Sequence, residues 1–421
     1  MFQSKKHPQQ DTRRVVAGLD VGTSKIAVVI GEIADGNRLL VVGAGLSPCK
    51  GFRQGVVINF EEAVQSIRRA VQEAQLTAGV ELEGVYLGIA GDQIHSVNSR
   101  GVVVVAGANR EITAEDKDRV LQAARTIALP AERKVIHVLP QEYIVDNQTG
   151  IKDPVGLSGV RLEAEVHIVT CAAALAQNLL RAVEEAGLRS NALVLEPLAS
   201  SHAVLESDEK KLGSVLIDIG GGTTDIAMFY GDTIRHTAMV PLGGQNVTND
   251  IAIGLKTSID DAEEIKKQHG CAHIDLVSRN ESFSTASFGG RGPKEVSRGV
   301  LTSIVQPRME EIFSLVLKEI KRSEYDNKMD AGVVLTGGGS LLQGSVELAE
   351  AVFRLPVRLG VPKGFGGLTE SVSGPLYATG IGLVLFGREF EKTGMPGQEE
   401  RVFRDRGWIQ SIWNRFRKEF F

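Results

Sequence analysis

Two short glycine-containing loops, about 200 residues apart, limit the possible folds of this chain more than any other feature. Residues 20–25 (DVGTSK) and 218–225 (DIGGGTTD) each follow an apolar stretch and repeat one pattern of acid, glycine and hydroxyl. Glycines let the backbone approach a phosphate, hydroxyls donate hydrogen bonds, and an Asp at a strand end can face a hydrated magnesium ion. A single turn of this kind is typical of a hairpin or bulge. Two related turns predict a cleft that holds the phosphates of a nucleotide between two halves of the chain.

Each predicted loop contributes residues to the phosphates and one acid to the metal. Lys25 is expected to reach the β- or γ-phosphate as a point charge. The residues predicted to contact the phosphates are Gly22, Thr23, Ser24, Lys25, Gly220, Gly221, Gly222, Thr223 and Thr224. Asp20 and Asp218 are predicted to face Mg²⁺ or its water shell.

A third glycine-rich turn follows the apolar residues 333–336 but carries no carboxylate. Its bare glycines, Gly337, Gly338 and Gly339, would allow an adenine or ribose to lie against the main chain. Glu263 and Lys266 lie three residues apart on one face of a predicted helix and are candidates to hold the ribose and base. An exposed helix ion pair is the simpler interpretation of those two residues.

Length and composition indicate a protein of two or three domains with ample core. The chain has 421 residues, of which 43% are hydrophobic, and a formal net charge of −5, which disfavours nucleic acid as the main partner. Its three cysteines are isolated in the sequence, so neither a disulfide framework nor a zinc site is predicted. No signal peptide and no apolar stretch of membrane-spanning length are found, so we expect a protein that is neither secreted nor membrane-spanning.

The last residues, 406–421, have the apolar stripe of an amphipathic helix and follow a polar linker, 393–405. Both tryptophans of the chain fall in this segment, beside several basic residues. Aromatic residues next to cations are typical of helices that lie in the headgroup region of an anionic membrane. A helix docked on the core of the protein itself is the alternative. The residues predicted to enter the membrane are Trp408, Ile409, Ile412, Trp413, Phe416 and Phe420.

The order of the three loops resembles that of the actin, Hsp70 and sugar-kinase superfamily. Residues 18–25 (GLDVGTSK), 137–143 (HVLPQEY) and 156–161 (GLSGVR), together with the amphipathic tail, are similar to the actin-like cell-division proteins of bacteria. The similarity runs from about residue 14 to the end of the chain. The loops alone specify only the superfamily, whereas the inserted segment and the tail specify the cell-division proteins.

This resemblance implies an α/β, duplicated ribonuclease-H-like fold of two actin-like domains, with an α+β subdomain inserted in the first and a C-terminal amphipathic helix. We expect the first domain over 13–80 and 166–205, the inserted interaction subdomain over 81–165, the second domain over 206–378 with an outer subdomain over about 245–325, and a closing interdomain helix over 379–392. Glu196, at the start of an interdomain helix, matches the place where such proteins orient the water that attacks the terminal phosphate. An acid favoured there by the helix dipole is the alternative.

The resemblance also implies a function. It predicts an ATP- and Mg²⁺-binding protein that polymerises at the cytoplasmic face of the inner membrane, where at most a slow ATPase acts as a structural switch. Its implied partners are other copies of itself, the C-terminal tail of the tubulin-like ring protein FtsZ, later division proteins at the inserted subdomain, and an anionic membrane. Arg298 and Arg308 are candidates to meet the acidic FtsZ tail. A small-molecule kinase of the sugar-kinase type is the alternative, and an Hsp70-like chaperone would need a peptide-binding domain that the sequence lacks.

Overall fold

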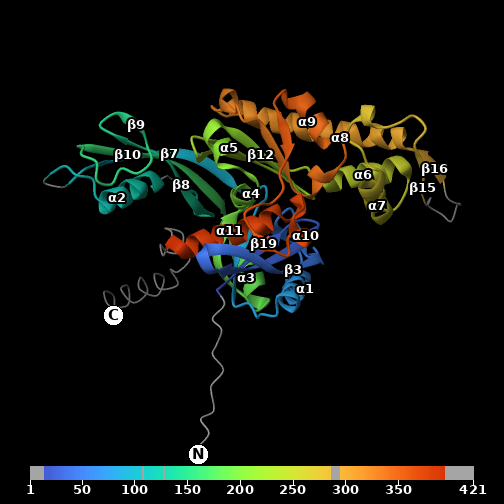
Figure 1. Cartoon of the computed structure of the whole chain (residues 1–421), viewed down its shortest axis with the longest axis horizontal. Helices are drawn as coiled ribbons and strands as arrows, with labels where there is room; N and C mark the ends of the chain where they lie inside the picture. The colour runs from blue at the N-terminus through green and yellow to red at the C-terminus, as the bar shows by residue number, and fades with distance from the viewer. Residues whose placement is uncertain (1–13, 107–108, 127–128, 286–293, 394–421) are drawn as a thin grey trace, which may run out of the picture.

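Two α/β domains lie one above the other, and a smaller subdomain projects to one side of them (Figure 1). The computed structural model describes residues 14–106, 109–126, 129–285 and 294–393. The predicted membrane helix, 406–421, and the linker before it lie outside the described residues, apart from Thr393. Within the described ranges, no helix combines the length and the apolar character needed to cross a membrane.

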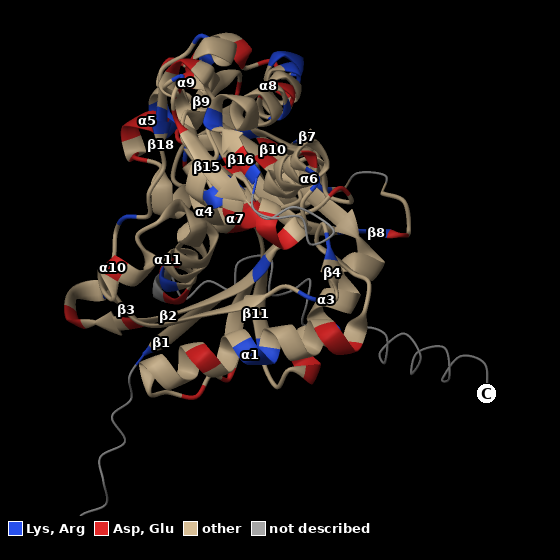
Figure 2. Ribbon diagram, turned by 90° about the vertical axis from the view of Figure 1, so that its right-hand side faces the viewer, with Lys and Arg blue, Asp and Glu red and all other residues tan. Residues whose placement is uncertain are grey.

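The first domain is built on a six-stranded sheet whose order is β11-β6-β1-β2-β3-β19. Its strands are β1 Val15–Val21, β2 Lys25–Ala34, β3 Arg38–Pro48, β6 Gly84–Ile89, β11 Arg189–Leu195 and β19 Gly366–Gly367. Helices α1 (Phe60–Ala78) and α3 (Ala173–Glu185) cover one face, with α1 below the sheet in Figure 2. Asn59 caps the start of α1, because its side chain accepts a hydrogen bond from the backbone N–H of Glu62.

The second domain repeats this arrangement with a five-stranded sheet of order β14-β13-β12-β17-β18. The strands are β12 Ser214–Ile219, β13 Thr224–Tyr230, β14 Thr233–Val240, β17 Val333–Thr336 and β18 Val357–Leu359. In each domain three antiparallel strands are followed by a strand parallel to the first of them, β6 beside β1 and β17 beside β12. The helices of the second domain are α5 Ser207–Leu212, α6 Gly244–Leu255, α7 Ile259–His269, α8 Arg298–Arg322 and α9 Ser345–Phe353. The predicted duplicated fold is therefore confirmed.

Two helices, α4 (Glu196–Val204) and α11 (Ala378–Thr393), cross between the domains. Their apolar residues share one core with strands of both sheets, such as Val16 of β1 and Leu216 of β12. A Cβ atom added at Gly382 of α11 would overlap the backbone of Ala199 in α4. This glycine therefore lets the two helices cross in backbone contact.

The inserted subdomain has its own four-stranded sheet, of order β7-β10-β8-β9, and its own apolar core under helix α2. Its elements are β7 His95–Val104, α2 Ala114–Arg125, β8 Arg133–Val145, β9 Gln148–Ile151 and β10 Arg161–Ala172. Two strand assignments from the sequence need correction. Strand β6, which we placed in the insertion, pairs with β1 and β11, and β10, which we placed in the first domain, pairs with β7 and β8.

Candidate functional site

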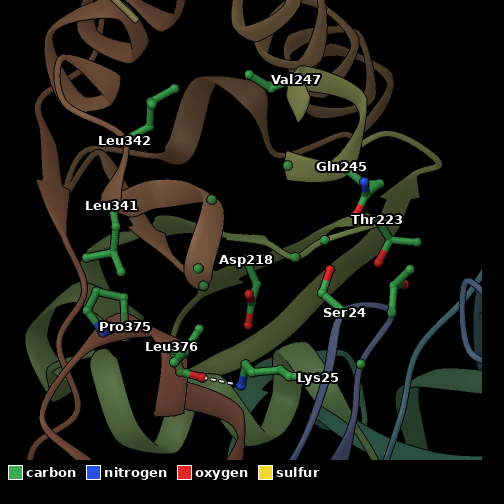
Figure 3. A pocket seen from close by; sticks show the side chains of 18 of the residues that line it. Ser24, Lys25, Asp218, Thr223, Gln245, Val247, Leu341, Leu342, Pro375 and Leu376 are labelled. Atoms are coloured by element: carbon green, nitrogen blue, oxygen red, sulfur yellow. Dashed lines mark hydrogen bonds between the residues drawn. The ribbon is translucent and has the colours of Figure 1, made fainter. Parts of the chain in front are cut away.

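The loops predicted from the sequence meet in one cleft of about 680 Å³ between the two domains. This volume lies within the usual range of small-molecule sites. Its walls include both predicted phosphate loops, the third glycine turn, and the start of the interdomain helices (Figure 3). The structure therefore brings together side chains that lie almost 360 residues apart in the sequence, such as Asp20 and Thr379.

The first loop joins β1 to β2 in a tight turn. The backbone N–H of Gly22 donates to the carbonyl of Lys25 over 3.1 Å, and Asp20, the second-to-last residue of β1, lines the cleft. The Lys25 Nζ donates over 2.6 Å to the carbonyl of Leu376, in the 3₁₀ turn Pro375–Tyr377 before α11, and lies 3.5 Å from the Asp20 carboxylate (Figure 3). Lys25 thus joins the first loop to the 3₁₀ turn that precedes the closing helix, α11.

The second loop makes the same turn between β12 and β13, where Gly220 N–H donates over 2.9 Å to the Thr223 carbonyl. The N-terminal turn of α6 supports the loop, because the backbone N–H groups of Gly244 and Gln245 donate to the Gly220 and Gly221 carbonyls over 2.9 and 2.7 Å. The glycines of this loop are needed for contact with the first loop. A Cβ atom added at Gly222 would lie 2.6 Å from the Thr23 hydroxyl oxygen.

Four carboxyl groups gather at the bottom of the cleft: Asp20, Glu196, Asp218 and Asp225. Burial raises the pKa of Asp218 to about 6 and the pKa of Asp225 to about 7. Burial also raises the pKa of Asp20, against the effect of Lys25, and raises the pKa of Glu196, which the neighbouring carboxylates raise further. A divalent cation would relieve this concentration of negative charge.

The donor set fits a magnesium ion that keeps part of its water shell. Among the described residues, no three His, Cys, Asp or Glu side chains lie close enough to form a complete metal site. Magnesium is usually bound through one or two carboxylates, several waters and the phosphates of its substrate. Asp20 and Asp218 are the second-to-last residues of the first strand of their domains, and both line the cleft, so they are placed to hold such an ion through water.

Glu196 is the first residue of α4, and its side chain lies against Gly88 at the end of β6. A Cβ atom added at Gly88 would lie 3.1 Å from the Glu196 Cγ. The backbone N–H of the preceding residue, Leu195, donates over 2.9 Å to Nε2 of the buried His137. The carboxyl group therefore lies on the wall of the cleft with a fixed backbone behind it.

The third glycine turn closes the other end of the cleft. Gly337 has a left-handed φ of 81°, and an added Cβ would clash with the Asp218 carboxylate, so only glycine suits this position. Beside this turn, Lys266 Nζ and Glu263 form an ion pair of 2.7 Å. The predicted ion pair therefore exists. Both side chains also line the cleft, where a nucleoside would reach them. Leu341 and Leu342 add an apolar wall suited to a base (Figure 3).

Comparison with known proteins agrees with this architecture. The family model "Cell division protein FtsA" matches residues 215–382, and the model "SHS2 domain inserted in FTSA" matches residues 91–170, which include the inserted sheet. The curated cell division protein FtsA of Pseudomonas aeruginosa is 48% identical over 382 residues, with 91% of each chain covered. The chain belongs to the FtsA family.

Other relatives extend this result over nearly the full length. The FtsA of Escherichia coli K12 is 39% identical over 416 residues, covering 97% of this chain and 99% of its own. Among solved structures, the PilM-PilN type IV pilus biogenesis complex matches with a TM-score of 0.65 at 19% identity, over 89% of this chain and 99% of that chain. MreB5 of Spiroplasma citri bound to ADP matches with a TM-score of 0.53 at 15% identity, over 91% and 99%. These two likenesses establish the actin-like fold.

Sequence reasoning missed several residues that line the cleft in this FtsA-family chain. Gln54 lies in the turn between β4 (Phe52–Arg53) and β5 (Val56–Val57), where it adopts a left-handed φ of 49°. Its side-chain amide reaches the carbonyls of Gly222 and Pro241 in the second domain, 3.4 Å away in each case. The hydroxyls of Thr379 and Ser200 both donate hydrogen bonds to the Asp218 carboxylate. The Gln-Gly pair at 54–55 was the one local signal of an unusual turn.

The two arginines predicted to meet an acidic partner form ion pairs with acids of the same chain. Arg308 forms an ion pair with Asp250 of α6 over 2.6 Å and a second one with Glu311. Arg298 forms an ion pair with Glu281, also over 2.6 Å, and its guanidinium lines the cleft. Their side chains are thus used to join elements of the outer subdomain, and a role toward FtsZ remains a prediction.

Proposed function

We propose that this chain is an ATP- and Mg²⁺-binding, actin-like cell-division protein that polymerises on the inner face of the cytoplasmic membrane and ties the FtsZ ring to it. The observation that carries this proposal is the contact of the two phosphate loops across the cleft, with Gly222 of one loop against Thr23 of the other. Membership of the FtsA family supports the role in division. The structural neighbour MreB5 binds ADP, which supports an adenine nucleotide as the ligand of this cleft.

In this proposal, nucleotide acts as a switch between domain arrangements. Phosphates that contact Lys25 and Thr223 at once would favour the closed cleft, because they bind it more tightly than an open one. The raised pKa of Glu196 and its place on the wall of the cleft suit a residue that would position water, at the slow rate of a switch. Mg²⁺, when bound, would neutralise phosphate charge, while Asp20 and Asp218 orient its waters.

Attachment to the membrane is assigned to residues 406–421. One such helix binds lipid weakly, so stable attachment would need many copies in a polymer. The FtsZ tail would bind the outer subdomain, where Arg298 and Arg308 are the basic candidates, and later division proteins would bind the inserted subdomain. The kinase alternative is not favoured, because the curated relatives that match nearly the whole chain are cell-division proteins.

Cosedimentation with anionic liposomes, with and without ATP and Mg²⁺, tests this proposal. We expect the full chain to pellet with lipid and to form filaments on it when ATP is present. A chain ending at residue 405 should stay in the supernatant while it still binds ATP. Equal pelleting of the two chains would contradict the membrane assignment, and a full chain that binds no ATP would contradict the nucleotide assignment.

A further inference from the structure

The inserted subdomain is hydrogen-bonded to strand β14 of the second domain, although it is inserted in the first. The Gln141 side-chain amide donates over 3.0 Å to the Ile234 carbonyl, and the Ser96 hydroxyl donates over 3.1 Å to the Thr237 carbonyl. At the rim of this interface, Lys152 and Asp232 form an ion pair of 3.0 Å. Backbone carbonyls of β14 thus accept hydrogen bonds from two different strands of the inserted sheet, β7 and β8.

His167, in the middle strand β10, is the centre of this interface. Its side chain is only 1% exposed, with Nδ1 2.7 Å from Asn98 Oδ1 and Nε2 3.0 Å from the Thr237 hydroxyl. The Asn98 amide nitrogen lies 3.4 Å from the Arg235 carbonyl, so its oxygen faces the ring. Because that oxygen only accepts, Nδ1 carries the proton, and the Thr237 hydroxyl donates to Nε2 in the neutral ring. The bonds from His167 to Thr237 and from Asn98 to the Arg235 carbonyl therefore require the inserted sheet and β14 to stay in register.

A second connection ties the inserted subdomain to the first domain, directly beside the cleft. His137 of β8 accepts the backbone N–H of Leu195, the residue before Glu196. His137 is 1% exposed and Leu195 is 3% exposed, so a loss of this bond would leave a polar group without water. The inserted subdomain is thus bonded to the residue that precedes one of the candidate functional acids.

Strand β14, to which the inserted subdomain is hydrogen-bonded, is itself connected to the cleft. Strand β14 pairs with β13, and the pair begins at Thr224↔Val240, beside the second phosphate loop. The Thr224 hydroxyl donates over 2.8 Å to the carbonyl of Leu242, just after β14. The chain then enters α6, whose first N–H groups support Gly220 and Gly221. The second loop is thus joined to β14, whose carbonyls accept from the inserted subdomain, both through β13 and through the chain that leads into α6.

We propose that the inserted subdomain is a brace between the two walls of the cleft, so that nucleotide binding in the cleft changes its packing on β14. This inference rests on the proposed nucleotide site. A rigid body bonded to both walls cannot follow a change in their separation without a change in one of its two sets of buried hydrogen bonds. Since Figure 1 shows the inserted sheet on the opposite side of the molecule from α6 and α7, the brace would report the state of the cleft to a distant surface.

Amide hydrogen exchange on the full chain, with and without ATP and Mg²⁺, tests the brace. We expect nucleotide to slow exchange in the two phosphate loops and, by about fivefold, in β14 and β10, the lower end of the usual range for coupling between sites. The variant His167→Leu should keep the response of the loops and lose the response of β10. Thr237→Val, which removes the hydroxyl with little change in volume, should do the same from the second domain.

The control is Lys117→Ala, which removes an ion pair of 3.0 Å with Asp153 inside the inserted subdomain and should leave both responses intact. If the loops respond and β14 and β10 do not, the brace is wrong and the nucleotide site stands. If the loops of the unmodified chain do not respond, the nucleotide site itself is wrong. If His167→Leu unfolds the subdomain, Thr237→Val decides the question, and an unchanged β10 response in that variant would overturn the proposal.

Discussion

The two phosphate loops have the same backbone and different side chains at equivalent positions. Residues 20–27 and 218–225 can be superposed in register, because Asp20 pairs with Ala27 across the first hairpin and Asp218 pairs with Asp225 across the second. Both turns are closed by the same hydrogen bond, Gly22 to Lys25 and Gly220 to Thr223. In this alignment, Thr23 and Ser24 match Gly221 and Gly222, Lys25 matches Thr223, and Ala27 matches Asp225.

The difference shows how a duplicated fold can divide one task. Side chains of the first loop fill space that the glycines of the second loop leave open, so the loops interlock only because they are unlike. The first loop also supplies Lys25, where the second has Thr223. The second loop supplies a further acid, Asp225, where the first has Ala27. We therefore expect exchanges that make the loops more alike to weaken nucleotide binding.

The largest effect is expected from Lys25→Thr, which gives the first loop the side chain of the second. Loss of a hydrogen bond from a charged group to phosphate costs about 1.5–3 kcal/mol, so ATP affinity should fall by about 100-fold in an equilibrium titration. Lys363→Thr, which removes an exposed ion pair with Glu206 away from the cleft, is the control and should have little effect. Equal affinities of both variants would rule out Lys25 as a phosphate ligand.

Gly222→Ser should come next, because it gives the second loop the side chain of the first. The new Cβ would lie 2.6 Å from the Thr23 hydroxyl and would push the loops apart. Overpacking of this kind costs about 1–3 kcal/mol, so we expect an affinity loss of about 30-fold. Gly22→Ala meets only the Lys25 carbonyl at 3.1 Å and should lose less. The reverse order of the two variants would show that the loops do not close on each other when nucleotide binds.

A smaller effect is expected when Asp20 and Asp218 are compared for their contribution to the effect of Mg²⁺ on ATP affinity. The charge of Asp20 is partly balanced by Lys25 at 3.5 Å, whereas Asp218 accepts hydrogen bonds from the neutral hydroxyls of Ser200 and Thr379. Asp218→Asn should therefore reduce the effect of Mg²⁺ on ATP affinity by about tenfold, and Asp20→Asn by less. Titrations with Mg²⁺ and with EDTA measure this difference, and an equal loss in both variants would contradict it.

The smallest effect is expected from Thr223→Val, which removes a neutral hydroxyl at the position equivalent to Lys25. One neutral hydrogen bond contributes about 1 kcal/mol, so affinity should fall by about fivefold. The same titration measures it. A loss as large as that of Lys25→Thr would mean that the two positions are equally important and that the contrast between the loops is wrong.

The loops could be predicted from the sequence because each is a local pattern. A strand, an acid, glycines and a hydroxyl occupy consecutive residues, and the structure places most of them in one cleft. Gly222 and Thr224 do not line it, because Gly222 packs against Thr23 and the Thr224 hydroxyl donates to the Leu242 carbonyl. The pairing of Glu263 with Lys266 could also be read from their spacing.

Features that depend on pairing between distant segments could not be predicted. The hydrogen-bonded neighbours of β6 and β10 show that β6 belongs to the first domain and β10 to the insertion, and neither strand carries a local pattern that reveals its neighbours. Gln54 reaches the second domain through a tertiary contact that no local pattern indicates. Arg308 looked exposed in sequence, but its partner, Asp250, lies on another helix.

The most direct test of the account is a crystal structure of the full chain with a non-hydrolysable ATP analogue and Mg²⁺. We predict one analogue per chain in the cleft, with phosphate oxygens in hydrogen-bond contact with both Lys25 and Thr223, and the metal on the side of Asp20 and Asp218. An analogue bound elsewhere, or phosphates that contact only one of the two loops, would contradict the claim that the unlike loops hold one nucleotide together.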